Sequence, residues 1–138
     1  MHTVVERELM LDMVLSPERS TPVAARLVYR TEDPYAVHVT FHITSQRPVT
    51  WTFARDLLRE GTHRAAGEGD VRVFPVRDRG HAVVCVALSS PEGQALLKAP
   101  ARVVWGWLGR TLRTVPPGEE RKWLDLDEAL RELLASDV

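Results

Sequence analysis

The sequence has a single cysteine, Cys85, among its 138 residues, which excludes an intrachain disulfide framework. Cys85 lies in the apolar run of residues 83–87, and this setting predicts a buried, unreactive thiol. No apolar run approaches the roughly 20 residues that cross a bilayer. Charged residues interrupt the apolar N-terminus, so no signal peptide is recognisable. We therefore expect a reduced, cytoplasmic protein without a membrane span.

The chain also lacks an excess of either charge. Eighteen Lys and Arg residues face 19 Asp and Glu residues, for a net charge of −1. Dedicated nucleic-acid binders usually carry a clear basic excess, so this balance argues against that class without excluding a local basic face. Hydrophobic residues make up 44% of the chain and charged residues 27%, as in soluble globular proteins. We expect residues 1–138 to form one domain.

Four early segments alternate between apolar and polar residues: 5–15, 23–30, 37–44 and 49–53. A period of two predicts strands with one apolar face, and the short turns at 32–34 and 45–48 favour antiparallel pairing. Two later segments, 71–76 and 82–88, also read as strands, joined as a hairpin across residues 77–80. Segment 82–88 is apolar on both faces, which predicts a position inside the sheet.

One short helix is expected at 54–59, and Gly61 ends it. Further helical patterns dominate the C-terminal part of the chain. The glycine-containing segment 61–70 reads as a flexible connector. Ser89-Ser90-Pro91-Glu92 predicts the start of a helix that Pro100 would end. A second helix follows at 101–113, and a third is expected to start at Asp125. The third helix is expected to bury Ala129, Leu130, Leu133 and Leu134.

Together these elements predict an α+β fold, a twisted antiparallel sheet with C-terminal helices packed on one side.

No arrangement of residues in the chain indicates chemistry. His38 and His42 lie four residues apart on one predicted strand, about 13 Å, which is too far to share one metal ion. The acidic residues of 119–128 fit helix caps better than paired catalytic carboxylates. No phosphate loop or nucleophile elbow is present. We expect no catalytic residue, no bound metal and no cofactor.

The helix at 101–113 has two apolar faces. One stripe comprises Ala101, Val104, Trp105, Leu108, Leu112 and Val115, at the spacing of a core-facing helix. Val103 and Trp107 lie nearly opposite this stripe. A second apolar face indicates either more core or a partner surface. Our hypothesis is that Val103 and Trp107 bury against another subunit or a partner protein.

Several short blocks in order along the chain resemble one known family. They are residues 33–37 (Asp-Pro-Tyr-Ala-Val), Trp51, residues 53–58, residues 69–73, residues 87–93 and residues 116–118 (Pro-Pro-Gly). This series resembles the SsgA-like sporulation and cell division proteins of filamentous actinobacteria. The blocks extend from about residue 30 to residue 118, and the series is specific although each block alone is not.

The resemblance implies a non-catalytic cytoplasmic regulator at the division septum. It implies protein contacts with the tubulin-like cell-division GTPase and with other SsgA-like proteins. It also implies a whirly-like fold, related to single-stranded nucleic-acid binders, and a homotrimer. A single-stranded nucleic-acid-binding module is therefore the alternative. The candidate partner contacts are Asp33 and Tyr35 in the turn at 31–35, and Arg55 and Arg59 in the short helix; local structure is the competing interpretation of each.

Overall fold

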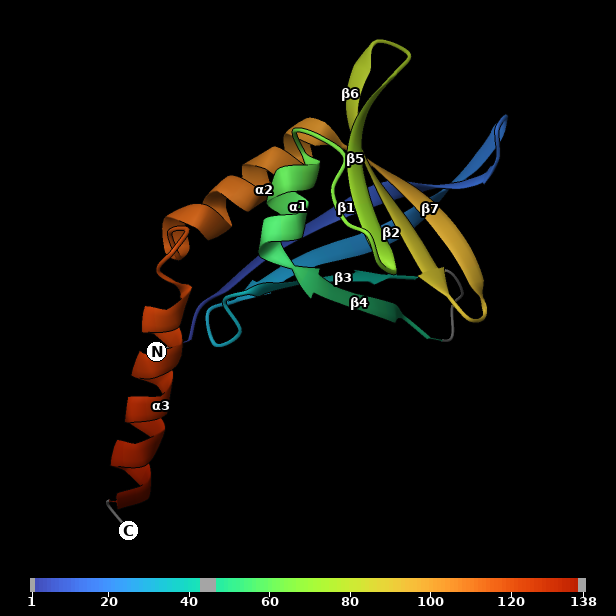
Figure 1. Ribbon diagram of the computed structural model, residues 1–138. Coiled ribbons are helices and arrows are strands. Elements are labelled where there is room, and N and C mark those ends of the chain that lie inside the picture. The colour runs from blue at the N-terminus through green and yellow to red at the C-terminus, as the bar shows by residue number, and fades with distance from the viewer. Residues whose placement is uncertain (1, 43–46, 137–138) are drawn as a thin grey trace.

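A computed structural model describes residues 2–42 and 47–136 (Figure 1). Within these residues the elements follow one another as β1 (Val4–Ser16), β2 (Arg19–Arg30), β3 (Ala36–Phe41), β4 (Val49–Ala54), α1 (Arg55–Gly61), β5 (Val71–Asp78), β6 (His81–Ser90), β7 (Gly93–Pro100), α2 (Ala101–Thr114) and α3 (Glu120–Ser136). The strands form one antiparallel sheet in the order β4-β3-β2-β1-β7-β6-β5. The predicted α+β class is confirmed. Part of the predicted strand 37–44 and of the turn at 45–48 lies outside the described residues.

The sheet consists of two antiparallel meanders, β1–β4 and β5–β7, that meet where β1 lies beside β7. The junction is short, because only Asp12 pairs with Lys98 and Met13 with Leu97. The two meanders turn strongly relative to each other, so the whole sheet curls around a hollow (Figure 1). β6 lies between β5 and β7, as its two apolar faces predicted, and Cys85 in it is buried.

The helix expected between Ser89 and Pro100 is wrong, because residues 91–92 lie in a turn and residues 93–100 form the strand β7. Ser90 pairs with Gly93 across a tight turn, and the backbone N–H of Glu92 donates to Ser90 Oγ at 3.3 Å. A serine followed by proline and an acid suits such a turn as well as a helix start, because the hydroxyl accepts from the backbone in both. Gly93 adopts a φ of 150° there, which L side chains rarely adopt.

The connection between α1 and β5 is held against β5, although the sequence indicated a flexible connector. Ala66 exchanges two backbone hydrogen bonds with Val73, at 2.8 and 2.9 Å. Gly61, at the end of α1, approaches Val73 so closely that a Cβ there would lie 2.3 Å from its side chain. The glycine that ends the helix therefore also permits its contact with the sheet.

A buried cation joins α1 to the rest of the chain. Arg55 is 1% exposed, and its guanidinium donates to the Thr111 carbonyl at 3.0 Å and to Glu120 Oε2 at 3.2 Å. The same group lies over the ring of Tyr29, 4.8 Å from the centroid. The Tyr29 hydroxyl in turn donates to the Pro34 carbonyl. We call Arg55, Glu120, Tyr29 and Thr111 the Arg55 network; it ties β2, α1, α2 and α3 together.

The ionisation of this network follows from its surroundings. Burial opposes the charge on Glu120. Hydrogen bonds from its own backbone N–H, from Arg55 and from Gly118 outweigh that effect, so the pKa of Glu120 lies below its ordinary value. Burial raises the pKa of Tyr29 to about 12 against the opposing charge of Arg55. The network is therefore a carboxylate, a guanidinium and a neutral phenol at neutral pH.

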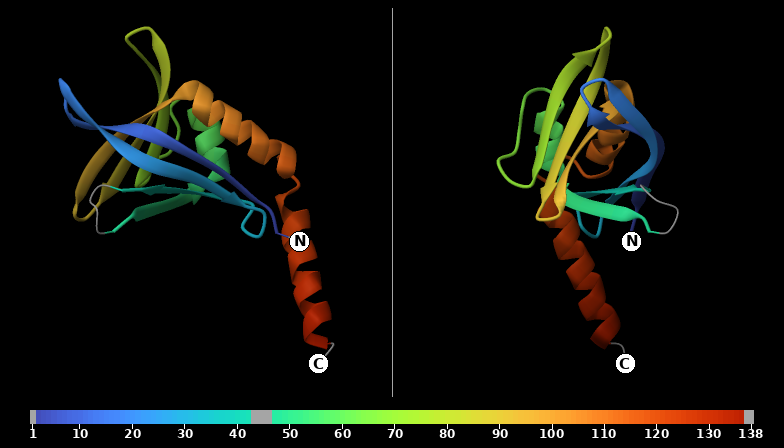
Figure 2. Two further views of the ribbon diagram at one scale, coloured as in Figure 1. Left: turned by 180° about the vertical axis from the view of Figure 1, so that it is seen from behind. Right: turned by 90° about the vertical axis from the view of Figure 1, so that its right-hand side faces the viewer.

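α3 starts at Glu120, earlier than the expected Asp125. Its first turn is fixed by the Arg55 network, where Glu120 Oε1 also accepts from the Gly118 N–H at 2.7 Å. The helix then projects away from the sheet (Figure 2). The expected burial of its later apolar residues is wrong, because Ala129, Leu133 and Leu134 are exposed and Leu130 is only partly buried. Periodicity identified the apolar side of this helix but not whether anything covers it.

We expect Arg55→Ala to lower the free energy of unfolding by about 3–5 kcal/mol, because it leaves Glu120 as a buried charge without its partner. Arg59→Ala is the matched control on the same helix. The Arg59 side chain is about half exposed and reaches Asp56 only at 4.0 Å, so its loss should cost about 0.5 kcal/mol or less. Urea unfolding of both variants measures the difference. Equal costs would contradict the assigned role of Arg55.

The lowered pKa of Glu120 predicts a loss of stability in acid. A carboxylate with a lowered folded-state pKa stabilises the fold above its unfolded value of 4.5. That stability is lost as the pH falls through the folded-state pKa. Glu120→Gln should therefore be less stable than the wild type at about pH 6 and should lose less stability between about pH 6 and about pH 3. Glu119→Gln removes the neighbouring charge and is the control. Its free energy of unfolding should depend on pH as that of the wild type does, in the same denaturation series.

Candidate functional site

The described residues hold no cluster of three or more His, Cys, Asp or Glu side chains that could bind a metal ion. Three of the acidic residues in and before α3 have structural partners: Glu120 pairs with Arg55, Glu119 with Lys122, and Asp127 with His2 and Arg131. Burial raises the pKa of the Cys85 thiol, which keeps it protonated and unreactive. The candidate site is therefore sought among surfaces rather than reacting groups.

The hypothesis about the second face of α2 rests on a wrong premise. Trp107 is 2% exposed and its indole N–H donates to the Val5 carbonyl at 3.0 Å. Val103 is partly buried, whereas Trp105 is 48% exposed. Residues 105 and 107 lie on different sides of the helix, and the curled sheet reaches the side that carries Trp107. The aromatic residue of α2 that is available to a partner is thus Trp105.

The four other candidate contacts divide between interior and surface. Arg55 is buried in the Arg55 network, so the expectation of an exposed contact is wrong for this residue. Asp33, Tyr35 and Arg59 are exposed, with Tyr35 at 50%. The turn at 31–35 and the first residue of α1 are adjacent, because the Arg55 N–H donates to the Tyr35 carbonyl at 2.7 Å. Their role as partner contacts stays a prediction.

A polar surface flanks this turn on the convex side of β3 and β4. His38 Nδ1 lies 2.8 Å from Thr52 Oγ1, and Thr40 and Thr50 join their hydroxyls at 2.9 Å. His38 Nε2 also lies 3.5 Å from Asp33. The predicted polar face of β3 is present, and its side chains bond to the threonines of β4.

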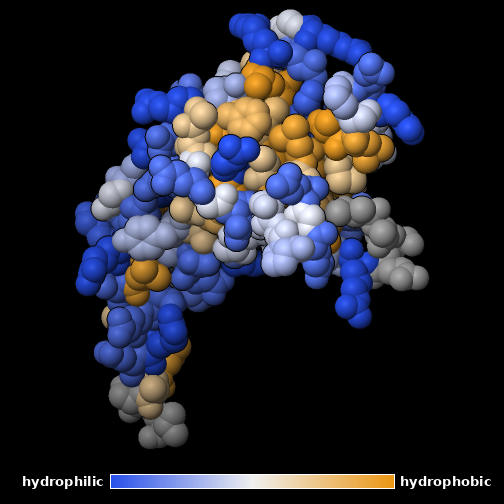
Figure 3. Space-filling view, turned by 45° about the vertical axis from the view of Figure 1, so that its right-hand side comes forward, coloured by the Kyte–Doolittle hydropathy of each residue, from blue (hydrophilic) through white to orange (hydrophobic). Residues whose placement is uncertain are grey.

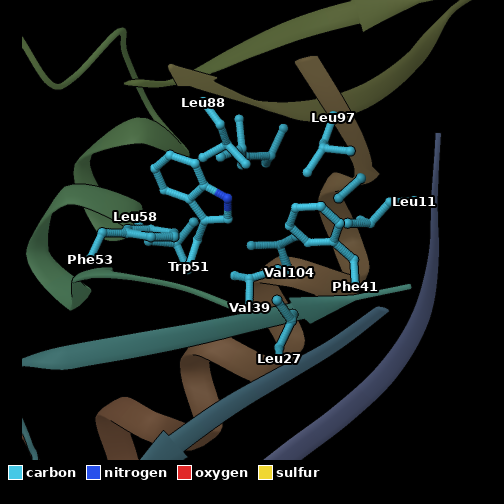
Figure 4. Close-up of a pocket in the computed structure, with 13 residues that line it drawn as sticks. Leu11, Leu27, Val39, Phe41, Trp51, Phe53, Leu58, Leu88, Leu97 and Val104 are labelled. Atoms are coloured by element: carbon cyan, nitrogen blue, oxygen red, sulfur yellow. The ribbon is translucent and has the colours of Figure 1, made fainter. Parts of the chain in front are cut away.

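An apolar cleft opens on the concave side of the sheet. Its walls come from both meanders and both packed helices, including Trp51, Phe41, Leu88, Leu58 and Val104. Trp51 lies on one side of the cleft, near Leu58, and its ring points toward Leu88 (Figure 4). In the space-filling view, apolar side chains gather in a continuous patch on this open side of the molecule (Figure 3).

The cleft is too small to be an ordinary ligand site. Its cavity volume is about 30 Å³, enough for about one water molecule, whereas small-molecule sites usually have about 300–1,000 Å³. The lining is aliphatic and aromatic, and the indole N–H of Trp51 is the one polar side-chain group among the described residues that form it. The cleft and its rim are better suited to a protein surface than to a bound small molecule.

A second apolar surface lies on the projecting part of α3. Leu126, Leu133 and Leu134 are 51, 66 and 70% exposed. Exposed leucines gathered on one helix are typical of a surface that another protein covers. None of the described helices combines the length and the apolar character that crossing a membrane requires.

Comparison with known proteins identifies the family of this chain. The family model described as the Streptomyces sporulation and cell division protein SsgA matches residues 23–120. The chain belongs to the SsgA family. SsgB from Streptomyces coelicolor is 57% identical to this SsgA-family chain over 135 residues, covering 98% of both proteins. SsgB from Thermobifida fusca is 40% identical, covering 96% of both.

Solved structures of SsgA-family proteins have the same fold. An SsgB structure from Streptomyces coelicolor matches this chain with a TM-score of 0.86 at 58% identity, covering 89% of this chain and 97% of the other. An SsgA-like sporulation-specific cell division protein from Thermobifida fusca also has a TM-score of 0.86, at 40% identity, covering 94 and 95%. The resemblance carried by the short sequence blocks is confirmed, and the two relatives compared above by sequence carry the name SsgB.

Sequence reasoning missed the cleft and the exposed part of α3. The residues of the cleft alternate as core residues do, and their pattern does not show that the curled sheet stays open on one side. The leucines of α3 likewise have core spacing. A usable signal was the density of acidic and basic residues in 119–132, around Leu126 and directly before Leu133 and Leu134, which leaves no wide apolar stripe to bury.

The two tryptophans of α2 provide a test of their assigned environments. Trp107→Ala should lower the free energy of unfolding by about 3–5 kcal/mol, because it empties a packed site and removes a buried hydrogen bond. Trp105→Ala should change it by about 0.5 kcal/mol or less. Chemical denaturation followed by circular dichroism compares the two. A larger effect at Trp105 would reverse the assignment.

Proposed function

We propose that this chain is a non-catalytic regulator of sporulation-specific cell division that helps to localise the tubulin-like division GTPase to septum sites. The observation that carries the proposal is the 57% identity with a sporulation-specific cell division protein over nearly the whole of both chains. Relatives from other genera that carry the same name, at 39–45% identity, add support. The chain would act in the cytoplasm, at the division septum.

Protein contact is the mode of action that these surfaces favour. The chain offers an apolar cleft, a projecting helix with exposed leucines, and exposed polar residues in the turn at 31–35 and on α1. Asp33, Tyr35 and Arg59 remain the proposed polar contacts, and Trp105 replaces Trp107 as the aromatic one. The apolar lining of the cleft on the concave side supports a role through protein contact.

Assembly with itself or with other SsgA-like proteins is the second part of the proposal. The resemblance implies a homotrimer, and the exposed leucines of α3 supply apolar surface for contacts between chains. Several weak contacts on one assembly would bind a polymer of the GTPase far more tightly than a single contact. In this way a small protein could act on a filament through several modest contacts.

Co-sedimentation tests the proposal. The purified protein is centrifuged with GTP-assembled polymers of the cognate division GTPase at moderate and at high salt. We expect enrichment in the pellet that depends on polymer, with the GTPase held unassembled in GDP as the control. The partial exposure of apolar side chains predicts that part of the binding survives high salt.

Two outcomes would contradict this function. Equal amounts in the pellet with and without polymer, at both salt concentrations, would remove the proposed contact. Binding to a single-stranded oligonucleotide that falls steeply with salt, in place of polymer binding, would support the nucleic-acid alternative instead.

A further inference from the structure

The two edge strands of the sheet differ in how they are protected. On β5, Val73 already exchanges its outward hydrogen bonds with Ala66. Pro75 occupies the next outward position of the same strand and has no N–H to offer. These are features by which proteins prevent the pairing of sheet edges between molecules. The β5 edge is therefore closed.

The β4 edge is open. Two backbone hydrogen bonds fix which residues of β3 and β4 bond to each other. The Arg55 N–H donates to the Tyr35 carbonyl, and the His42 N–H donates to the Ala24 carbonyl. In this register Val49, Trp51 and Phe53 direct their backbone groups toward β3. Thr50 and Thr52 therefore direct their N–H and C=O groups outward.

No described strand pairs with β4 on its outer side. The strand is Val-Thr-Trp-Thr-Phe-Ala, without a proline or a charged residue that would repel another strand.

The sequence of this edge is symmetric about Trp51, with a threonine on each side. If a second β4 lies antiparallel to the first with Trp51 on a two-fold axis, Thr50 of one copy is opposite Thr52 of the other. The same register places Val49 opposite Phe53. Every facing pair is then threonine with threonine or apolar with apolar, and such pairs stabilise adjacent strands.

We propose that β4 pairs with β4 of a second copy of this chain about this axis, so that the sheet continues from one molecule into the next. Thr50 and Thr52 of one copy exchange N–H and C=O hydrogen bonds with Thr52 and Thr50 of the other. The contact is isologous, because both copies use the same surface. It adds to the assembly proposed above and does not depend on the identity of the GTPase.

The ends of the strand fit the same register. Pro48 falls opposite Ala54 of the second copy. Ala54 is the N-cap residue of α1, so its carbonyl already accepts the first hydrogen bond of the helix. Pro48 has no N–H that would need this carbonyl, while its own carbonyl can accept from the N–H of Ala54. The pairing therefore leaves no donor without an acceptor along the six-residue strand.

The side chains on the concave face also match. Trp51 faces Trp51 of the second copy at a pair without direct hydrogen bonds, where side chains on neighbouring strands approach each other most closely. Trp51, which lines the apolar cleft, is only partly buried, and Val49 two residues before it on the same face of β4 is 37% exposed. Pairing would cover these two side chains with apolar residues of the second copy.

The expected contact is weak, because one edge of six residues buries much less than the roughly 1,200–2,000 Å² of a stable interface. The molar mass of the purified full chain should therefore rise with concentration between about 10 μM and about 1 mM. Sedimentation velocity or light scattering measures it, starting from whatever assembly exists at the lowest concentration.

Thr52→Pro and Thr52→Ala form a matched pair of variants. Both variants lose the hydroxyl that reaches His38. Only proline also removes the backbone N–H of residue 52, which points outward, so neither variant loses a backbone hydrogen bond to β3. The association constant of Thr52→Pro should fall at least tenfold, and that of Thr52→Ala should change by less than about threefold.

Variants with charged residues at positions 50 and 52 give an independent measurement if the proline variant does not fold. The double variant Thr50→Lys with Thr52→Lys places like charges opposite each other, as does the double variant with Glu at both positions. Each alone should no longer associate with rising concentration. An equal mixture should restore association, because Lys then faces Glu across the axis.

Three results would overturn the proposal. They are a molar mass that does not depend on concentration, equal behaviour of the proline and alanine variants, and a mixture of the two charged variants that does not associate. Loss of polymer binding in Thr52→Pro without any change of molar mass would assign the edge to a strand of the partner rather than to a second copy. If pelleting with the GTPase fails while self-association follows these rules, the proposed function is wrong and this contact stands.

Discussion

The Arg55 network is the interaction on which the rest of this structure depends. A guanidinium that is 1% exposed can be buried only where opposite charge and oriented acceptors surround it. Those partners come from three other elements, β2, α2 and α3, so the position of α1 also fixes the end of α2 and the start of α3. Since α1 follows β4 directly, the network further determines where the outer edge of the sheet lies. The surfaces that a partner meets are thus set by a contact that no partner touches.

The helices close one end of the curled sheet but not its open side. Trp107 and Val104 fill the interior from α2, and Leu58 fills it from α1. The remaining apolar side chains, with Trp51 among them, are left at a rim instead of a sealed core. A sheet of seven strands can bury its concave face fully only by closing into a barrel, and here its two edge strands do not pair with each other. Exposed apolar surface therefore follows from the topology as well as from individual residues.

The sequence predicted most of the sheet, because alternation with a period of two directly reflects one buried face. It predicted α1 and α2 closely as well. It failed at Ser89–Glu92, where a hydroxyl, a proline and an acid fit both a helix start and a tight turn; the pairing of β7 with β6 decided between them. It also failed at Trp105 and Trp107, since the spacing of apolar residues does not show from which side the sheet covers a helix. Arg55 could not be identified as buried, because its partners Thr111 and Glu120 lie 56 and 65 residues away.

The same separation has a consequence for synthesis of the protein on the ribosome. The strands and α1 emerge long before Glu120, and until then the guanidinium of Arg55 has no anion with which to enter the interior. A nascent chain can form its hairpins early, because their contacts are local. The junction of α1 with α2 must wait until about residue 120 has left the exit tunnel. A chain that ends before this point would expose a charged side chain and apolar surface together, the condition in which incomplete domains aggregate.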